Sequence, residues 1–352
     1  MAEKIRVGLV GYGYAGKTFH APLIAGTPGL ELAAVSSSDA GKVHADWPSM
    51  TVVGDAQALF ADPTLDLIVI PTPNDTHFPL AQQALAAGKH VVVDKPFTVT
   101  LSQARALQQQ AQQSGLLLSV FHNRRWDSDF LGVKQVIEQG LIGKVTHFES
   151  HIDRYRPEVR VRWREQNLPG SGLWFDLGPH MVDQALQLFG LPHSVQANIA
   201  TLRPNAQIND WAHVVLNYPT HRVILHGSML VAGGVSRFTV HGEKGSVVKA
   251  RADGQESQLL AGVTPGSAEW GKDDDAMSLF IGTEPVRTLP TPDGDQRQYY
   301  FQVRDALRGA GANPVTAAQA LAVMAVLEAA TLAAETGVTQ TLPLTEAEIA
   351  AW

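Results

Sequence analysis

The sequence predicts two domains: an α/β domain built on a parallel sheet over residues 1–121, then an α+β domain with a large, mostly antiparallel, open-faced sheet over residues 122–352. Two patterns predict this organisation. Up to residue 121, short continuous apolar runs alternate with helical stretches, as in a parallel sheet covered on both faces. From about residue 143, strand-like runs follow one another with turns between them, as in an antiparallel sheet.

The composition is that of an ordinary globular protein, with 45% apolar and 17% charged residues in a chain of 352. The net charge of −7 argues against a broad surface for nucleic acid or for anionic membranes. The absence of cysteine excludes disulfides, thiolate catalysis and cysteine-ligated zinc. A core strand is expected directly after the N-terminus, which leaves no room for a signal peptide, and no apolar run is expected to reach membrane length. We therefore expect a soluble, cytoplasmic protein.

The strand expected at Ile5–Val10 leads into a glycine-rich loop, Gly11-Tyr12-Gly13-Tyr14-Ala15-Gly16. A G-x-G-x-x-G turn between a strand and a helix is the dinucleotide-binding fingerprint of the Rossmann fold. Its first glycine permits the tight turn, its second lets the backbone approach a pyrophosphate, and its third lets the helix pack closely on the strand. We therefore expect this loop to hold a dinucleotide, with contacts at Gly11, Gly13, Tyr14, Ala15 and Gly16.

Residues 11–18 also satisfy the P-loop pattern G-x-x-x-x-G-K-[ST], through Lys17 and Thr18. A P-loop enzyme needs a magnesium-holding aspartate at the end of another apolar strand. The nearest such strand, Leu67–Ile70, instead runs into Pro71-Thr72-Pro73-Asn74. The sequence therefore favours a dinucleotide, and Lys17 is then expected to be a solvated lysine of the first helical turn. A nucleoside triphosphate, or a glycine turn without a ligand, stays open as an alternative.

Three serines follow the second strand, which is expected at 30–35, and Asp39 comes directly after them. An NAD-preferring fold usually has an acidic residue here to hold the ribose 2′-hydroxyl. Serines can instead accommodate a 2′-phosphate that a carboxylate would repel. Asp39 argues against this interpretation unless it caps the next helix, and an ordinary polar turn is a further alternative. The sequence favours NADP, with contacts at Ser36, Ser37, Ser38 and Lys42.

Polar clusters follow the last three strands of the first sheet, which are expected at Leu67–Ile70, His90–Val93 and 116–121, with helices notably at 79–87 and 102–113. Parallel sheets bind ligands at the carboxyl ends of their strands. These clusters are a rigid polar turn over 72–77, an Asp-Lys-Pro segment whose lysine can face the reactive end of the cofactor, and a dense group at 122–126 that marks the domain boundary. The expected cofactor contacts here are Thr72, Pro73, Asn74, His77, Asp94, Lys95, Asn123 and Arg125. Simple solvation is the alternative for the lysine.

The second domain is expected to place one face of its sheet on helices and to leave the other free. Its strands are expected at 144–152, 194–202, 212–217, 222–230, 237–241 and 246–250, with a hairpin at Glu243-Lys244-Gly245. A free sheet face is a natural surface for a homodimer or homotetramer, although it can also simply face solvent. Residues 253–295 are expected to form loops around edge strands, and two helices, at 296–308 and 316–335, close the chain.

An amphipathic helix is expected to run to Phe189 and to begin near Asp176, because Pro179 is tolerable only in a first turn. Asp176 and His180 then stand one turn apart on one face. A carboxylate beside an imidazole orients the ring and raises its basicity, as a general base requires. The alternative is an N-capping Asp176 and a buried structural His180. No metal site is predicted, because no third ligand follows at a recognisable spacing.

Several motifs, taken in order, resemble the glucose-fructose oxidoreductase/inositol dehydrogenase (Gfo/Idh/MocA) family. They are the glycine loop, a T-P-N-x-x-H turn, the D-K-P segment and a G-x-x-x-D-x-x-x-H helix. The resemblance covers nearly the whole chain, including Tyr299-Tyr300 and Asn313-Pro314-Val315. Residues 122–130 and 154–165 resemble more narrowly the NADP-dependent scyllo-inositol dehydrogenase branch. One departure is Asp94, where many relatives carry glutamate, and this shortens a side chain near the cofactor ribose.

The resemblance implies an NADP-dependent oxidoreductase in which Lys95, Asp176 and His180 take the catalytic positions. His180 would remove the hydroxyl proton as hydride leaves the same carbon, Lys95 would stabilise the reacting oxygen, and Asp176 would hold a neighbouring hydroxyl and orient His180. The expected substrate is a polyol, most closely scyllo-inositol. Another sugar or aldose, or a non-catalytic cofactor-sensing regulator, is the alternative. The substrate-binding candidates are Lys95, Asn123, Tyr155, Arg156, Arg162, Asp176 and His180. Arg154 and Arg164 are further candidates, and these arginines could equally hold a sugar acid or form ion pairs.

Overall fold

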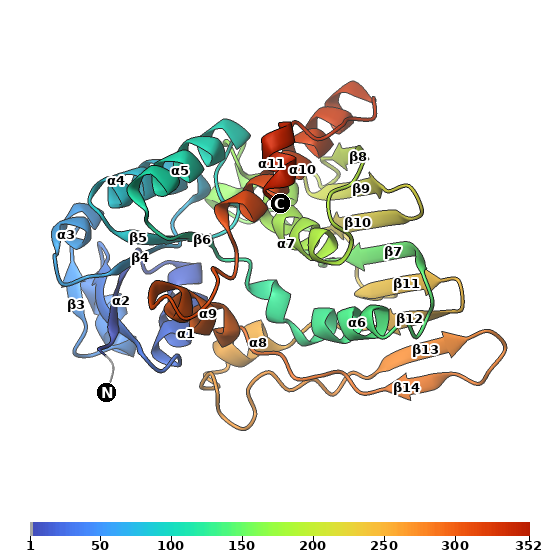
Figure 1. Cartoon of the computed structure of the whole chain (residues 1–352), viewed down its shortest axis with the longest axis horizontal. Helices are drawn as coiled ribbons and strands as arrows, with labels where there is room; N and C mark the ends of the chain where they lie inside the picture. The colour runs from blue at the N-terminus through green and yellow to red at the C-terminus, as the bar shows by residue number, and fades with distance from the viewer. Residues whose placement is uncertain (1–2) are drawn as a thin grey trace. The chain divides into compact units, whose positions relative to one another are not determined.

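Two sheets organise the chain in the computed structural model, which describes residues 3–352 (Figure 1). One packing unit consists of the chain up to Asn123 together with Gln255–Trp270 and Asp295–Leu321. The other consists of Arg124–Gly254, Gly271–Gly294 and Ala322–Trp352. The division at residues 121 and 122 stays a prediction about domains. The structure adds that Gln255–Trp270 and Asp295–Leu321 pack with the first sheet, although no local sequence pattern predicts this.

The first unit contains six parallel strands in the order β3-β2-β1-β4-β5-β6. The chain runs outward from β1 in one direction to β3 and then crosses to β4 on the other side, so the strand order reverses between β1 and β4. Such a reversal opens a crevice at the carboxyl ends of the strands. The strands are β1 (Ile5–Val10), β2 (Leu30–Ser36), β3 (Thr51–Val53), β4 (Leu67–Ile70), β5 (His90–Val93) and β6 (Leu118–Val120). The parallel sheet is confirmed, and β6 is three residues shorter than predicted.

Helices cover both faces of this sheet, with α4 and α5 on one side and α1 and α9 on the other (Figure 1). Their bounds are η1 (Gly16–His20), α1 (Ala21–Ala25), α2 (Ala40–Asp46), α3 (Ala56–Ala61), α4 (Asn74–Ala86), α5 (Leu101–Ser114), α8 (Gln255–Leu260) and α9 (Arg297–Leu307). The polar turn predicted over 72–77 is therefore wrong for its second half, because α4 already begins at Asn74. Pro79 lies inside α4, where burial of Asn74, His77 and Ala81 offsets the backbone hydrogen bond that a proline cannot make.

The second unit contains an eight-stranded sheet in the order β14-β13-β12-β11-β7-β10-β9-β8. Its pairings are antiparallel except for that of β7 with β10, so the predicted mostly antiparallel sheet is confirmed. The predicted hairpin is also confirmed, since β11 ends at Gly242 and β12 begins at Gly245. The strands are β7 (Val145–His151), β8 (Ser194–Ala200), β9 (Trp211–Asn217), β10 (Arg222–Ser228), β11 (Phe238–Gly242), β12 (Gly245–Lys249), β13 (Met277–Ile281) and β14 (Arg287–Leu289).

One face of this sheet is buried and the other is partly exposed. Along β7, β9 and β10, Phe148, Val214 and Leu225 are fully buried, whereas alternate residues such as His147 and His213 are partly exposed. Helices α6 (Ser128–Glu138) and α7 (Gly172–Phe189) lie on the buried side (Figure 1). The open face expected from the sequence is therefore present.

Helix α7 begins at Gly172, four residues before the predicted start, so Pro179 lies inside it. The first-turn N–H groups of this helix have partners that are distant in sequence. The N–H of Leu173 donates to the carbonyl of Asn209 at 2.9 Å, and the N–H of Trp174 donates to Asn209 Oδ1 at 2.9 Å. This external cap allows the earlier start, and burial of most of the helix offsets the bond lost at Pro179.

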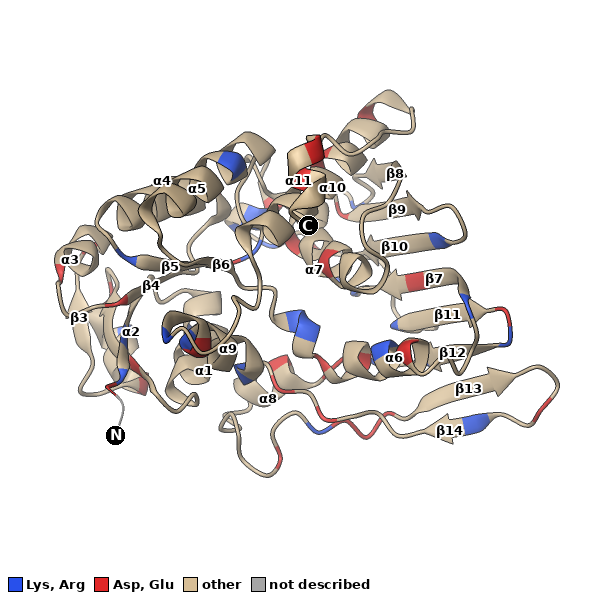
Figure 2. Ribbon diagram, viewed as in Figure 1, with Lys and Arg blue, Asp and Glu red and all other residues tan. Residues whose placement is uncertain are grey.

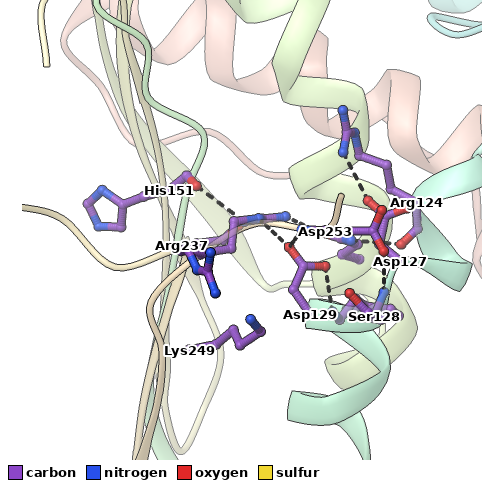
Figure 3. Close-up of polar contacts among 12 residues, drawn as sticks. Arg124, Asp127, Ser128, Asp129, His151, Arg237, Lys249 and Asp253 are labelled. Carbon is purple, nitrogen blue, oxygen red and sulfur yellow. Dashed lines mark hydrogen bonds and ion pairs between the residues drawn. The ribbon is translucent and has the colours of Figure 1, made fainter. Parts of the chain in front are cut away.

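A buried polar network attaches α6 to the sheet and to α7 (Figure 3). Arg237 donates to Asp129 Oδ2 at 3.0 Å and to Gln184 Oε1 at 2.8 Å. The N–H of Ser128 donates to Asp253 Oδ2 at 2.8 Å. Because these buried charges have partners, the network orients α7 without leaving an uncompensated ion.

Helix α10 (Ala317–Thr336) corrects the prediction that no apolar segment reaches membrane length. Its length and composition would be sufficient to cross a membrane. However, 61% of its most apolar window is buried within the protein, as in a core helix. Short helix α11 (Glu346–Ala350) follows it. In the part of the chain that the structure describes, acidic and basic residues are distributed over both units, and no single element gathers the basic ones (Figure 2).

Candidate active site

The glycine loop of the first unit has the geometry that a pyrophosphate requires. Gly11 has a φ of +94°, which only glycine adopts without strain. A Cβ at Gly16 would lie 2.4 Å from the carbonyl oxygen of Gly11, so the close approach there also requires glycine. Beside Gly13, by contrast, a Cβ would meet no heavy atom of the described residues within 4 Å. The loop therefore leaves open space where a dinucleotide phosphate would lie, and the residues present fit this group.

Tyr14 and Ala15, the other predicted loop contacts, open the helical segment that continues through η1. The Tyr14 hydroxyl donates to Glu256 Oε1 at 2.7 Å. Lys17 is exposed at the start of the helical segment, as predicted, and its Nζ lies 2.7 Å from Asp46 Oδ2 in a surface ion pair. The same Asp46 oxygen accepts from the Tyr12 hydroxyl at 2.9 Å. This ion pair holds the lysine that a P-loop would need for phosphates.

The end of β2 is tied to the glycine loop, because the N–H of Gly11 donates to the carbonyl of Ser36 at 2.8 Å. The Ser37 hydroxyl accepts from the N–H of Asp39 at 3.1 Å, while Ser38 is exposed. Asp39 Oδ1 accepts from the N–H of Lys42 at 3.0 Å and so caps α2. The alternative that Asp39 is a helix cap is confirmed, and its carboxylate is engaged within its own turn.

His77 joins the loops that follow β4 and β5. Its Nε2 lies 2.9 Å from the carbonyl oxygen of Thr72, and its Nδ1 lies 2.8 Å from that of Pro96. The ring is fully buried. His77 therefore holds Thr72 and the Lys95-Pro96 segment in place, and its contact with the cofactor stays a prediction. Pro73 is the N-cap residue of α4, and Asn74 is buried in its first turn.

Asp94 is a buried carboxylate at the end of β5. It accepts from the N–H of Lys95 at 2.7 Å, and its Oδ2 lies 3.8 Å from His20 Nε2. Burial acts to raise the pKa of Asp94, but interaction with His20 and the charges of Lys95 and His77 outweigh it and lower this pKa to about 2. His20 Nδ1 in turn lies 2.6 Å from the hydroxyl of Tyr300. This group fixes the backbone from which the half-buried Lys95 projects.

The predicted contacts at 122–126 divide between the two units. Asn123, in the first unit, donates to Gln296 Oε1 at 3.0 Å. Arg125, in the second, is buried and binds Asp183 of α7 through Nε at 2.9 Å and through its terminal nitrogen at 2.6 Å. Its guanidinium therefore forms a buried ion pair, and a contact of Arg125 with the cofactor stays a prediction.

On α7, Asp176 and His180 lie one helical turn apart, as predicted. Two arginines converge on the carboxylate, with Arg154 3.6 Å from Asp176 Oδ2 and Arg164 3.5 Å from Asp176 Oδ1. Because α7 begins at Gly172, Asp176 is not its N-cap, and that alternative is wrong. His180 is buried, with 7% of its surface exposed.

The remaining arginines form the ion pairs that the sequence left open as an alternative. Arg162 pairs with Glu165 at 3.1 Å, and its predicted contact with the substrate stays a prediction. Glu165 also pairs with Arg203, which in turn pairs with Asp210 at 2.9 Å. Tyr155 is exposed. Burial and the charges of nearby arginines lower the pKa of the Arg156 side chain. The backbone N–H of Arg156 donates to the carbonyl of Met229 at 2.7 Å.

Arg203 and Asn209 also belong to this site, although no sequence motif marks them. They lie in a segment between β8 and β9 without periodicity. Arg203 binds the nearby Asp210 and the distant Glu165, and Asn209 binds the distant start of α7. Together with Arg162, Arg164 and Asp176, they line a small polar cavity in the second unit. No motif in the sequence marks Arg203, and only the Asn209-Asp210 dipeptide is a polar pair that could have drawn attention to this segment.

These features define a class of protein: an oxidoreductase with a nucleotide-binding Rossmann unit and a second unit that carries a carboxylate–imidazole pair. Residues 5–122 match the model of the oxidoreductase family with NAD-binding Rossmann fold, and residues 134–343 match the C-terminal alpha/beta domain of the same family. The chain belongs to the Gfo/Idh/MocA oxidoreductase family. It therefore has a binding unit for a nicotinamide cofactor.

The chain is similar to proteins of known sequence over nearly its full length. It is 59% identical over 331 residues to the uncharacterised oxidoreductase YdgJ of Escherichia coli, covering 93% of this chain and 96% of that protein. It is 36% identical over 333 residues to the scyllo-inositol 2-dehydrogenase (NADP(+)) IolW of Bacillus subtilis, covering 93% of each. The crystal structure of a candidate oxidoreductase from Klebsiella pneumoniae superposes with a TM-score of 0.94 at 62% identity, covering 99% of this chain and 98% of that one.

Proposed function

We propose that this protein is a soluble, cytoplasmic, NADP-dependent dehydrogenase that transfers hydride between a hydroxyl-bearing carbon of a polyol or sugar and nicotinamide. The substrate that we propose is scyllo-inositol, which is oxidised to the inosose and re-formed in the reverse direction. The activity for which IolW is named supports this choice, at 36% identity over 93% of the chain. The observation that carries the proposal is the Asp176–His180 pair on α7, with Arg154 and Arg164 on the carboxylate.

The chemistry that we assign to these residues follows from their types and surroundings. NADP, when bound, accepts the hydride. We propose that His180 accepts the proton of the reacting hydroxyl and that Lys95 donates a hydrogen bond to the same oxygen as negative charge develops on it. Two guanidinium groups within 3.6 Å stabilise Asp176 as a carboxylate. An ionised Asp176 can accept a hydrogen bond from a neighbouring hydroxyl of the substrate, which a polyol provides.

The preference for NADP is supported by the turn after β2. The acidic residue there caps its own helix, while Ser38 and Lys42 are exposed. Hydroxyl and ammonium groups are the donors that a 2′-phosphate accepts. We propose that Ser37, Ser38 and Lys42 bind this phosphate, and that the glycine loop binds the pyrophosphate.

The proposal is tested by assaying a panel of cyclic polyols and aldoses with both NADP and NAD. Turnover of scyllo-inositol with NADP is the expected result. If only another sugar is turned over, the protein is still a dehydrogenase, but the proposed substrate is wrong. Tight NADPH binding without turnover of any polyol or aldose would instead favour a cofactor-sensing regulator. We also propose a homodimer or homotetramer assembled through the open face of the second sheet, with no nucleic-acid or membrane partner.

A further inference from the structure

The open face of the second sheet carries a cluster of titratable side chains that the proposed dehydrogenase does not use. Along β7 and its continuation, every second residue is titratable: His147, Glu149, His151 and Asp153. Alternate residues of a strand point to the same face. The cluster therefore belongs to the face opposite the helices, although the sequence analysis predicted no metal site.

The strand register extends this cluster across the sheet. His226 of β10 lies opposite His151 of β7 in a parallel pairing, and His213 of β9 lies opposite His226 in an antiparallel one. Three imidazoles thus form a row across three neighbouring strands. The ring centroids of His151 and His226 are 5.1 Å apart. Figure 3 shows the His151 ring directed away from Arg237 and its network, while the His151 carbonyl accepts from Arg237 at 3.4 Å.

Three ligand atoms of this cluster lie close enough together to share one ion. Asp153 Oδ2 lies 3.3 Å from His151 Nδ1, and Asp153 Oδ1 lies 3.7 Å from His226 Nε2. One ligand atom from each of the three residues lies within 4.8 Å of the other two. In a tetrahedral zinc site with bonds of about 2.0–2.1 Å, neighbouring ligand atoms are roughly 3.3 Å apart. The separation of His151 Nδ1 from Asp153 Oδ2 matches this value, and that of His226 Nε2 from the other carboxylate oxygen is longer, at 3.7 Å.

The other nitrogen of each ring already has a partner. His151 Nε2 lies 3.2 Å from Glu149 Oε2, and His226 Nδ1 lies 3.3 Å from His213 Nδ1. A metal-binding histidine usually donates its second ring N–H to such a partner, which sets the tautomer and the ring orientation. With those protons on Nε2 of His151 and Nδ1 of His226, the two remaining nitrogens lie beside the carboxylate of Asp153 and can coordinate an ion. Without an ion, His151 Nδ1 can instead donate to Asp153 Oδ2 at 3.3 Å.

A second observation points independently to a ligand at this place. Asp153 Oδ1 is buried and has no hydrogen-bond donor among residues 3–352, and its side chain is only 9% exposed. A buried carboxylate oxygen without a donor is costly. The fold retains this oxygen between two imidazole rings, where a bound cation would satisfy it.

We propose that His151, Asp153 and His226 bind a divalent transition-metal ion of the zinc type. Two imidazole nitrogens and a carboxylate oxygen are ligands that Zn²⁺ prefers, and three protein ligands leave a fourth position for water or an external donor. The ion would link β7 to β10, the parallel pair at the centre of the sheet. This proposal does not depend on the proposed dehydrogenase activity.

The test uses the full-length protein, freed of metal with a chelator and titrated with Zn²⁺ in competition with a chromophoric chelator. The expected result is one tight equivalent per chain. Asp153→Asn and His226→Asn should each abolish it, and Glu149→Gln should weaken it by about 10–100-fold because it removes the partner that orients His151. His241→Asn is the matched control, since His241 lies on β11 and its ring bonds to Ser246 instead. It should retain the tight equivalent.

Absence of a tight equivalent in the unaltered protein would overturn the proposal, and so would its persistence in a His151→Asn/His226→Asn double variant. If the variants fail to fold, the unaltered protein still decides the matter. X-ray absorption of its zinc-loaded form should show two imidazole nitrogens and at least one further light ligand. The Co²⁺-loaded form should have the visible spectrum of a four-coordinate ion. A six-coordinate spectrum without imidazole would contradict the assignment.

Discussion

The carboxylate of Asp39 accepts a hydrogen bond from the backbone N–H of Lys42 at 3.0 Å, and this bond makes Asp39 the N-cap of helix α2. The relationship bears on the choice of cofactor. An acidic residue after the second strand usually binds the ribose 2′-hydroxyl of NAD. Here one oxygen of that carboxylate caps its own helix, so Asp39 has a structural role that does not require NAD.

Replacement of Ser37 should therefore change the cofactor preference. We expect the unaltered protein to bind NADPH at least about tenfold more tightly than NADH, since a charge-assisted hydrogen bond contributes roughly 1.5–3 kcal/mol. Ser37→Asp should abolish or reverse this preference, because a carboxylate repels the 2′-phosphate, whereas Ser37→Ala should only reduce it. Fluorescence titration with both cofactors measures the change. Equal affinities in the unaltered protein would contradict the assignment.

The proposed catalytic roles predict that chemistry and cofactor binding separate. His180→Ala should lower kcat by about 10²–10⁴ through loss of general-base catalysis and leave NADPH affinity nearly unchanged. Lys95→Ala should lower kcat by a similar or larger factor, because it also removes stabilisation of the forming oxyanion. Asp176→Asn should be milder and should raise KM as well. The exposed His193→Ala serves as the control. A His180→Ala variant with most of its turnover intact would make His180 a structural histidine.

The low pKa of Asp94, about 2, predicts how stability depends on pH. Because the folded-state pKa lies below the ordinary value of 3.8, Asp94 stabilises the fold above that value. The stabilisation, roughly 2 kcal/mol at neutral pH, is lost as the pH falls from about 5 toward 2. Denaturant unfolding across this range should show the loss, and Asp94→Asn should flatten it. If the variant loses as much stability at low pH as the unaltered protein, other carboxylates cause the loss.

The buried ion pairs of Arg203 predict a large effect on stability. Its side chain is 1% exposed and pairs with Glu165 at 2.5 Å and with Asp210 at 2.9 Å. Arg203→Met should lower the free energy of unfolding by about 3–5 kcal/mol, because two buried carboxylates lose their cation. Arg251→Met is the matched control: this arginine is 63% exposed, and its loss should leave the free energy of unfolding nearly unchanged. Similar losses in the two variants, measured by chemical denaturation, would refute the argument.

The open sheet face predicts a homo-oligomer at micromolar concentration. On this face, Ile224 of β10 lies opposite Val215 of β9 and both are partly exposed. Ile224→Glu should place a charge in the proposed interface and lower the mass found by light scattering. Leu260→Glu, an exposed apolar position on α8 that is 61% exposed, should leave the mass unchanged. A monomer in the unaltered protein would be the contrary result.

Local patterns were sufficient for the elements of this fold because each pattern reflects the environment of its own segment. The buried run Ile5–Val10 and the glycines that follow it predict a strand and a phosphate-binding turn. The positive φ of Gly11 and the contact at Gly16 bear out the physical reasons given for them. Boundaries were less accurate where the partner of a helix end is distant. Helix α7 begins four residues before its predicted start because Asn209 caps it.

What the sequence determined by itself was which chemical groups the chain has, their order and their local spacing: the glycine loop, the Asp-Lys-Pro segment, and Asp176 one turn from His180. The tertiary structure alone decided which of several similar side chains remain for a ligand. Nothing local distinguishes Arg154 from Arg162, yet one lies against Asp176 and the other pairs with Glu165. Likewise, His151 and His226 are 75 positions apart and become neighbours only through strand register. The physical reason is that burial and charge pairing depend on distances in space, which the folded sheet sets and the spacing along the chain does not.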